Sequence, residues 1–300
     1  MKKYNRPICL FQRIKMSKAD YSVYQRDMRE YRIVNNIPLR GIKLRKIIYP
    51  AVAFGVKLFR IANGHTIEVV SDRRTPSEKP VIFAVTHIGK FDIERVFEAC
   101  GTSCWIFNGD PDTVYRNFDG FSLFFSGVIL IDTDCKTDRE VALKTAVKLL
   151  NSGGNLMFFP EGIWNVEPSI PVLPLYPGIA KIATETGAEI IPVAIEQYGK
   201  HFQIVFGSNI SVDKYRQRIK EADKQCVYQE LLQQLRDEMA CLKWKIFELN
   251  HAKRKEIGNF DLYQKDRVNE KLSEWTNKNN EPYFSVQTLR NRQYNCKSSL

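Results

Sequence analysis

A histidine and an aspartate five positions apart are the residues of this chain best suited to acid–base chemistry. His87 follows the apolar run 81–86, and Asp92 stands where the next helix is expected to begin. In such a turn the carboxylate can accept a hydrogen bond from one imidazole nitrogen and leave the other to take a proton. The pair therefore predicts a general base with its orienting carboxylate. A structural alternative stays open, in which Asp92 caps the helix and His87 only ends the strand.

A second carboxylate, Glu161, lies in the string Phe-Pro-Glu-Gly that closes the apolar run 155–159. It stands at the exit of a buried strand, as either an acceptor-binding or a structural group. The chain has no G-x-S-x-G string and no cysteine beside a motif histidine, so it offers no evident nucleophile for a covalent mechanism. Its four histidines and seven cysteines show neither zinc spacing nor a C-x-x-C pair. We therefore expect no metal, no disulfide framework and a reducing compartment.

The elements that must position these residues alternate between strands and helices from residue 66 onward. Short β-branched or aromatic runs predict strands at 66–71, 81–86, 103–107, 128–131, 155–159, 189–195 and 203–206. Helical patterns lie at 92–99, 137–151 and 178–186. The alternation predicts an α/β fold with a single, largely parallel sheet. His87 would then lie at the carboxyl edge of the sheet, where open α/β sheets bind ligands.

The positive charge of the chain is confined to its N-terminal part. The net charge is +11, yet residues 1–60 hold 15 Lys or Arg and only 3 Asp or Glu, and the remainder is near neutral. Residues 1–41 show no clear periodicity, whereas 42–62 predict a basic-rimmed apolar helix ended by Asn63-Gly64. We expect residues 1–62 to dock on an anionic membrane surface. The open alternatives are a solvated basic arm and an ordinary helix packed on the rest of the protein.

Two other partners of a basic segment are not expected. The apolar run 47–56 is too short to span a bilayer, and the N-terminus does not have the pattern of a signal peptide. No known nucleic-acid-binding motif accompanies the basic residues, so we do not expect nucleic acid as a partner. The predicted location is therefore peripheral, on the cytoplasmic side of a membrane.

The second half of the chain contains a proline-rich loop and a long helical pattern. Prolines recur every third residue at 168, 171, 174 and 177, which predicts a stiff polyproline II loop on the surface. Apolar residues at spacings of three and four predict one long amphipathic helix over 213–256. Residues 257–300 are polar and are expected to be partly disordered.

His87-x4-Asp92 followed by Phe-Pro-Glu-Gly resembles the glycerolipid acyltransferases of the lysophosphatidic acid (1-acyl-sn-glycerol-3-phosphate) acyltransferase type. The strings 127–132 and 191–193 resemble the second and fourth blocks of that family, and Gly178 and Ala180 fall where it keeps small residues. The resemblance covers 66–207. Together with the charge and helical patterns outside that range, it predicts three parts: a membrane-docking segment at 1–62, a catalytic domain at 63–211 and a helical extension with a polar tail at 212–300.

The resemblance also implies a reaction. An acyl group would pass from acyl-CoA or acyl-carrier protein to a hydroxyl of a lysophospholipid-like acceptor, directly and without a cofactor, with phosphatidic acid as the family's default product. His87 would be the base and Asp92 its orienter. The residues expected to bind substrate are Glu161, Gly162, Lys90, Trp164 and Pro192.

The sequence departs from the family where the acceptor phosphate is usually held. Thr133 replaces an arginine of the second block, and Ile163 and Trp164 replace the Thr-Arg pair of the third. Neither Thr nor Trp offers the guanidinium fork that suits a phosphate, although Lys90 could supply a cation. The departures favour an unphosphorylated acceptor, such as a glycan or glycolipid, as the alternative. A catalytically weak, membrane-associated binding homologue and an unrelated nucleic-acid-binding protein are the remaining rivals.

Overall fold

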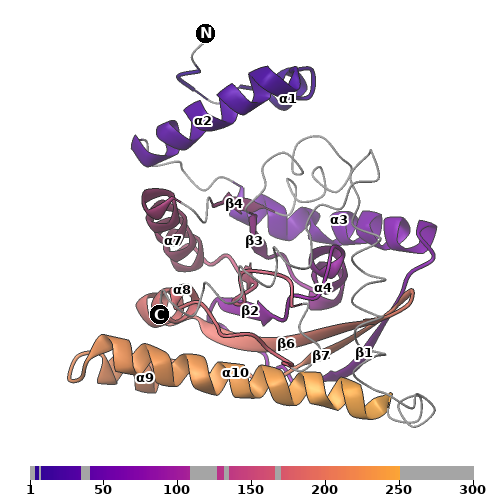
Figure 1. The fold of residues 1–300 in the computed structure, drawn as a ribbon, viewed down its shortest axis with the longest axis vertical. Coiled ribbons are helices and arrows are strands. Elements are labelled where there is room, and N and C mark those ends of the chain that lie inside the picture. The colour runs from indigo at the N-terminus through magenta and orange to yellow at the C-terminus, as the bar shows by residue number, and fades with distance from the viewer. Residues whose placement is uncertain are drawn as a thin grey trace. The chain divides into compact units, whose positions relative to one another are not determined.

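The computed structural model describes residues 4–6, 8–34, 41–108, 127–131, 135–165 and 170–250 (Figure 1). Thr133, Pro168 and the predicted tail 257–300 lie outside the described residues, so the expectations placed on them stay predictions. Helices and strands alternate from residue 66, as the sequence predicts. The helices are α1 (Leu10–Ile14), α2 (Lys18–Val34), α3 (Ile42–Ala62), α4 (Asp92–Cys100), α7 (Lys136–Asn151), α8 (Gly178–Thr186), α9 (Asp213–Arg218) and α10 (Lys224–Leu249).

Seven strands form one sheet in the order β1-β7-β6-β2-β5-β3-β4. Their bounds are β1 (Thr66–Asp72), β2 (Val81–Val85), β3 (Trp105–Asn108), β4 (Val128–Leu130), β5 (Leu156–Phe158), β6 (Glu189–Tyr198) and β7 (His201–Phe206). The pairs β1–β7, β2–β6, β3–β4 and β3–β5 are parallel, and β6–β7 is antiparallel. The predicted α/β fold with a largely parallel sheet is confirmed.

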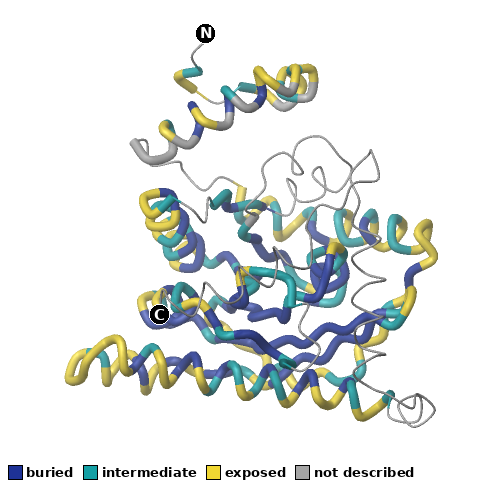
Figure 2. Tube along the Cα trace, viewed as in Figure 1, coloured by how far each residue is buried: buried dark blue, intermediate teal, exposed yellow. Residues whose placement is uncertain are grey.

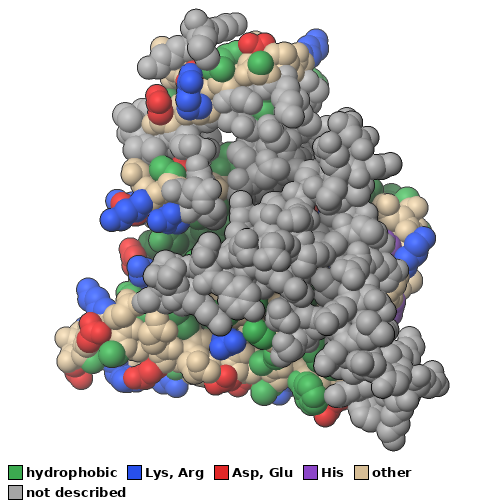
Figure 3. All heavy atoms as spheres, in the orientation of Figure 1, with side chains coloured by type: hydrophobic (Ala, Val, Ile, Leu, Met, Phe, Trp, Pro, Cys, Tyr) green, Lys and Arg blue, Asp and Glu red, His purple; other side chains and the backbone are tan. Residues whose placement is uncertain are grey.

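The chain divides into two compact units, and the candidate site lies in one of them. This unit, which we call the site unit, comprises residues 56–101 and 158–300. Its central strands β2, β6 and β7 are dark blue along most of their length in Figure 2, because nearly every side chain on them is buried. Helix α10 covers β6 and β7 through Leu242 and Ile246, which pack on Ala194 and Val205. The outward face of α10 carries acidic and basic side chains side by side (Figure 3).

The other unit comprises residues 1–55 and 102–157, and it corrects one expectation. Residues 1–41 show no clear periodicity in sequence, yet they contain α1 and α2. The buried positions of α2 include Tyr21, Tyr24 and Met28, which form a small cluster. These positions are three and four residues apart, as helical packing requires, but tyrosine is polar enough to hide the pattern. Helix α2 also contacts α7.

The predicted long C-terminal helix is confirmed as α10, but two other expectations about the second half of the chain were wrong. The pattern over 213–256 contains two helices and not one, because Asp223 begins α10 by accepting a hydrogen bond from the backbone N–H of Cys226 at 3.2 Å. Residues 251–256 lie outside the described part. The proline-rich loop is not a surface segment, since Val172, Leu173 and Leu175 are buried in it. Pro177 has helical dihedral angles and begins α8.

Helix α3 has the bounds that the sequence predicts, and Gly64 ends it with a φ of +69°. Five large apolar side chains of α3 are exposed over more than half of their surface: Leu44, Ile47, Phe54, Leu58 and Ile61. None of the helices in the described part of the chain is long and apolar enough to cross a membrane. The predicted boundaries at 62/63 and 211/212 stay predictions.

Candidate active site

The imidazole of His87 lies at the carboxyl end of β2 and is fixed by Asp92. The Nδ1 atom of His87 is 2.9 Å from the Oδ2 atom of Asp92, which is the hydrogen bond that the spacing predicts. The His87 side chain is 17% exposed and that of Asp92 only 1%. Because the carboxylate accepts from Nδ1, we place the proton of neutral His87 there. The Nε2 atom is then the one that can take a proton.

Asp92 holds more than the imidazole. Its Oδ2 atom also accepts the backbone N–H groups of Ile88, at 2.6 Å, and Gly89, at 2.8 Å. The N-cap position of α4 belongs to Phe91, so Asp92 is the first residue of the helix rather than its cap. The alternative in which Asp92 caps the helix was therefore wrong about the cap. The carboxylate closes the turn from β2 to α4 and thereby sets the position of the imidazole.

Glu161 is buried, and its two carboxylate oxygens each accept a backbone N–H group. Oε1 accepts from His87 and Oε2 from Leu173, both at 2.8 Å. Burial raises the pKa of Glu161 from 4.5 to about 7, although the two backbone donors oppose that increase. These contacts favour the structural role among the two that the sequence left open.

The turn after β5 binds the main chain of His87 on both sides. The N–H of His87 donates to Glu161, and its C=O accepts the backbone N–H of Asn165 at 2.7 Å. Gly162 lies between these two residues with a φ of +67°. A Cβ atom there would stand 2.4 Å from Cε2 of Tyr176. The turn therefore requires glycine twice, for its dihedral angle and for the aromatic ring beside it.

Two aromatic rings lie against the imidazole of His87. The ring centroid of Phe159 is 4.4 Å from that of His87, and the centroid of Trp164 is 6.0 Å away in an edge-on arrangement. Lys90, another predicted binding residue, is exposed, and its Nζ atom lies 5.4 Å from the ring centroid of Phe91.

Pro192 is the remaining predicted binding residue. It is buried within β6, opposite Ala84 of β2, and its carbonyl accepts the N–H of Gly207. Its role in binding stays a prediction, as does that of Lys90.

Sequence reasoning missed two residues of the site, Asn165 and Leu173. Both act through their backbone N–H groups, so the identity of the side chain carries little signal. Asn165 also uses its side-chain amide to bind the carbonyl of Ile170 at 2.8 Å. An asparagine in a short turn after a motif is the one hint that the sequence offered.

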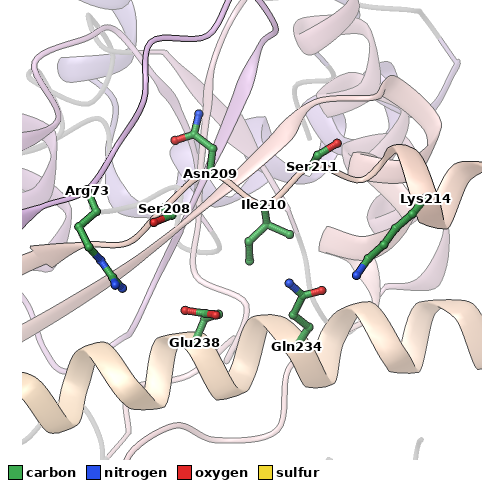
Figure 4. Close-up of a pocket in the computed structure, with 8 residues that line it drawn as sticks. All are labelled: Arg73, Ser208, Asn209, Ile210, Ser211, Lys214, Gln234 and Glu238. Carbon is green, nitrogen blue, oxygen red and sulfur yellow. The ribbon is translucent and has the colours of Figure 1, made fainter.

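A separate polar hollow of about 390 Å³ lies in the site unit, at the opposite edge of the sheet (Figure 4). It follows β1 and β7, which run antiparallel to β6, and Ile210 pairs with Ile190 near the beginning of β6. The lining residues are Arg73, Ser208, Asn209, Ile210, Ser211, Lys214, Gln234 and Glu238. In the part of the chain that the structure describes, no cluster of His, Cys, Asp or Glu could hold a metal ion.

Comparison with known proteins finds similarity over the part of the chain that holds both motifs. Residues 66–196 match the family model described as Acyltransferase. A 1-acyl-sn-glycerol-3-phosphate acyltransferase of Chlamydomonas reinhardtii is 25% identical over 158 residues, which is 50% of this chain and 46% of that protein. The chain thus spans about half the length of this relative. The crystal structure of the 1-acyl-sn-glycerophosphate (LPA) acyltransferase PlsC from Thermotoga maritima is 17% identical, with a TM-score of 0.47 over 74% of this chain and 94% of that one.

Proposed function

We propose, from the premise that residues 66–196 are an acyltransferase-family domain, that this protein transfers an acyl group from a thioester to a hydroxyl of a lysophospholipid-like acceptor. The observation that carries the proposal is the hydrogen bond between His87 and the buried carboxylate of Asp92 at the carboxyl edge of the sheet. A partly exposed imidazole with one nitrogen fixed and the other available is what a general base requires.

The proposed step uses one proton transfer and one acyl transfer. Nε2 of His87 takes the proton of the acceptor hydroxyl while the oxygen attacks the thioester carbonyl. The carbon–sulfur bond of the tetrahedral intermediate then breaks, and the leaving thiolate of CoA or carrier protein takes the proton from the imidazolium. Asp92 stabilises the positive imidazolium between these two events. Positioning of both substrates accounts for much of the remaining acceleration.

Glu161 supports this chemistry indirectly. It binds the N–H of His87, and Asn165, four residues later, donates its own N–H to the His87 carbonyl. The first motif therefore supplies the imidazole, and the second fixes the main chain that carries it. This division of roles explains why the two strings occur together in one chain, 74 residues apart.

We propose that α3 docks the protein on an anionic membrane surface. Its exposed apolar residues recur at intervals of three, seven, four and three, so they lie on one side of the helix. Lys43, Lys46 and Lys57 are exposed beside this stripe. Two other cations of α3 are engaged within the protein: Arg45 lies 4.9 Å from the Trp105 ring, and Arg60 binds Glu98. The apolar stripe with its three lysines is suited to the boundary between anionic headgroups and acyl chains.

An unphosphorylated acceptor remains the alternative. The side chains placed against His87 are the aromatic rings of Phe159 and Trp164, which suit an apolar chain or the face of a sugar. Charge-assisted bonds to a phosphate, worth about 1.5–3 kcal/mol each, would have to come from other groups.

One experiment tests the reaction and the choice of acceptor. Labelled acyl-CoA or acyl-carrier protein is incubated with the full chain and a lipid extract, and the product is identified by mass. Lysophosphatidic acid and unphosphorylated acceptors are then compared at equal concentration, with His87→Ala as the control. Acyl transfer by the unaltered chain alone supports the proposal, and preference for lysophosphatidic acid eliminates the alternative. Turnover by folded His87→Ala equal to that of the unaltered chain would refute the mechanism.

A further inference from the structure

An ion pair joins the end of the docking helix to the helix that begins at Asp92. Arg60 of α3 binds Glu98 of α4 in a forked arrangement, with Nε 2.9 Å from Oε2 and Nη2 3.0 Å from Oε1. The two side chains are only 13% and 15% exposed. A two-point guanidinium–carboxylate contact of this kind fixes orientation as well as distance.

His65, at the start of β1, extends this connection. Its backbone N–H donates to the carbonyl of Arg60 at 3.1 Å, and its own carbonyl accepts from Nη1 of Arg60 at 2.9 Å. Its Nδ1 atom is 2.9 Å from Nη2 of Arg95, a fully buried residue of α4. Burial and the nearby cations Arg95, Lys200 and Arg60 lower the pKa of His65 to about 4. The ring is therefore neutral near pH 7 and accepts a hydrogen bond from Arg95.

The same contacts reach the residue next to Asp92. The ring of Phe91 lies 4.7 Å from that of His65, and the guanidinium of Arg95 lies 5.2 Å from the Phe91 ring. Glu98 is six residues beyond Asp92 on α4, a distance of about 9 Å along the helix axis. Hydrogen bonds from Arg60 and His65 thus hold α4 at Glu98 in its last turn and at Arg95 near its middle, and a ring contact from His65 reaches Phe91 just before its first residue.

Arg60 is also part of the helix that carries the exposed apolar stripe. Leu58 and Ile61, its close neighbours in sequence, are each exposed over more than half of their surface, while the side chain of Arg60 is largely buried against Glu98 of α4. We propose that Arg60, His65, Arg95 and Glu98, which we call the positioning cluster, transmit the docking of α3 to α4 and so set the geometry of His87 and Asp92. This inference rests on the proposed function and makes turnover depend on a membrane surface.

The physical basis is the geometry of Asp92. Its Oδ2 atom holds three N–H groups at 2.6–2.9 Å, so a displacement of α4 changes all three contacts together. A misplacement of about 1 Å at a reacting group can cost about 10²-fold in rate. The hydrogen bonds of the positioning cluster described above do not include the imidazole of His87, so the cluster acts through the placement of α4.

Charge reversal with restoration tests the role of the ion pair. Turnover is measured for the full chain with a water-soluble acceptor, with and without vesicles that contain anionic lipid. We expect vesicles to raise kcat of the unaltered protein without changing KM for the acyl donor. Arg60→Glu and Glu98→Arg should each lose that stimulation, about ten- to a hundredfold in kcat. The double variant, which restores the pair in reverse, should recover most of it. Failure of the double variant to recover would overturn the proposal.

A second readout does not depend on catalysis. The backbone amides of Ile88 and Gly89 donate to Asp92, so their hydrogen exchange reports directly on the turn. We expect vesicles to slow this exchange in the unaltered protein and in the double variant, but not in either single variant. Vesicles that leave the exchange unchanged in the unaltered protein would refute the inference. Slowed exchange without acyl transfer to any acceptor would instead refute the proposed function.

The matched control is an ion pair elsewhere in the site unit. Arg218 and Glu230 join α9 to α10 and contact neither α3 nor α4 through their side chains. Arg218→Glu and Glu230→Arg should leave the stimulation by vesicles unchanged. Co-sedimentation with vesicles and thermal unfolding show whether each variant still docks and folds. Loss of stimulation in these controls would show that general destabilisation, and not the positioning cluster, causes the effect.

Discussion

The turns around His87 and the exposed face of α3 are built on opposite principles. In the turns, which comprise residues 86–92 and 159–165, the imidazole of His87, the carboxylate of Asp92 and the main chain of His87 are all held by hydrogen bonds of 2.6–2.9 Å. On α3, apolar side chains point away from the protein over five positions. Burial and hydrogen bonding restrict the turns to one geometry. The exposed face of α3 instead presents apolar surface area and positive charge to its surroundings.

This difference indicates how each region responds to substitution. A single atom matters in the turns, because the groups that hold His87 each have a specific partner. On α3, apolar area and charge act as sums over several residues, so one substitution changes little and several change much. We therefore expect single substitutions in the turns to affect the reaction and grouped substitutions on α3 to affect binding.

The largest expected effect is that of His87→Ala on turnover. General-base catalysis is worth about 10²–10⁴-fold, and Asp92, Phe159 and Trp164, which contact the imidazole, cannot replace it as a base of similar pKa. Asp92→Asn should cost a large part of the same factor, because an amide no longer fixes the tautomer. Steady-state kinetics measure both. Vesicle binding should be unchanged in each variant, and a decrease in binding would show that the two regions are not separable.

The next effect is on membrane binding. Replacing Lys43, Lys46 and Lys57 with Gln removes three cations, worth about 1 kcal/mol each near an anionic surface, or about 10²-fold in total. Co-sedimentation with anionic vesicles measures the loss, and added salt should reproduce part of it. The charge-matched control replaces Lys181, Lys220 and Lys224, which are exposed elsewhere. Equal losses in both sets would show that net charge alone, without the apolar stripe, governs binding.

A smaller effect is expected from Gly162→Ala in the second turn. The new Cβ atom meets Cε2 of Tyr176 at 2.4 Å, and the φ of +67° adds strain of about 1–2 kcal/mol. Gly101→Ala is the matched control, because Gly101 has a φ of +70° but no atom within 4 Å of the added Cβ. We expect Gly162→Ala to lower the free energy of unfolding more than Gly101→Ala does, by about 1–3 kcal/mol. Equal values in chemical denaturation would mean that the Tyr176 ring moves aside without cost.

Much of the fold and of the site follows from local sequence. The helices of 42–62, 92–99, 137–151 and 178–186 and all strands but one are found within one or two residues of their predicted ends, because their apolar patterns are strong. The exception is β6, which continues three residues beyond its predicted end at 195. The contact between His87 and Asp92 could be predicted because both residues belong to one short turn. Glu161 could be predicted only as a carboxylate at the end of a strand.

The remaining features depend on contacts that the sequence does not encode locally. The partners of Glu161 are backbone groups of His87 and Leu173, which are 74 and 12 residues away. The ion pair of Arg60 and Glu98 joins residues 38 positions apart, and neither residue belongs to a motif. The break at Asp223 was missed because a capping residue inside a charged helical pattern resembles any other surface aspartate.

The smallest expected effect is a pair of opposed titrations, one of Glu161 in the turns and one of His65 in the positioning cluster. The pKa of Glu161 is raised from 4.5 to about 7, so folding favours its protonated form, and stability falls as the pH rises from about 4.5 to about 7. The pKa of His65, near the end of α3, is lowered from 6.5 to about 4, so folding favours its neutral form. Stability from His65 is therefore lost as the pH falls from about 6.5 to about 4.

Between about pH 4.5 and 6.5 the two slopes have opposite signs and should largely cancel in the unaltered protein. Glu161→Gln removes one of them, so its free energy of unfolding should fall on acidification. His65→Gln removes the other, so its free energy of unfolding should rise on acidification to about pH 4.5. Chemical denaturation at several pH values measures the two slopes, whatever constant loss each substitution adds. Only groups whose pKa values are shifted in opposite directions give slopes of opposite sign. Parallel pH curves for the two variants would therefore contradict the raised pKa of Glu161 or the lowered pKa of His65.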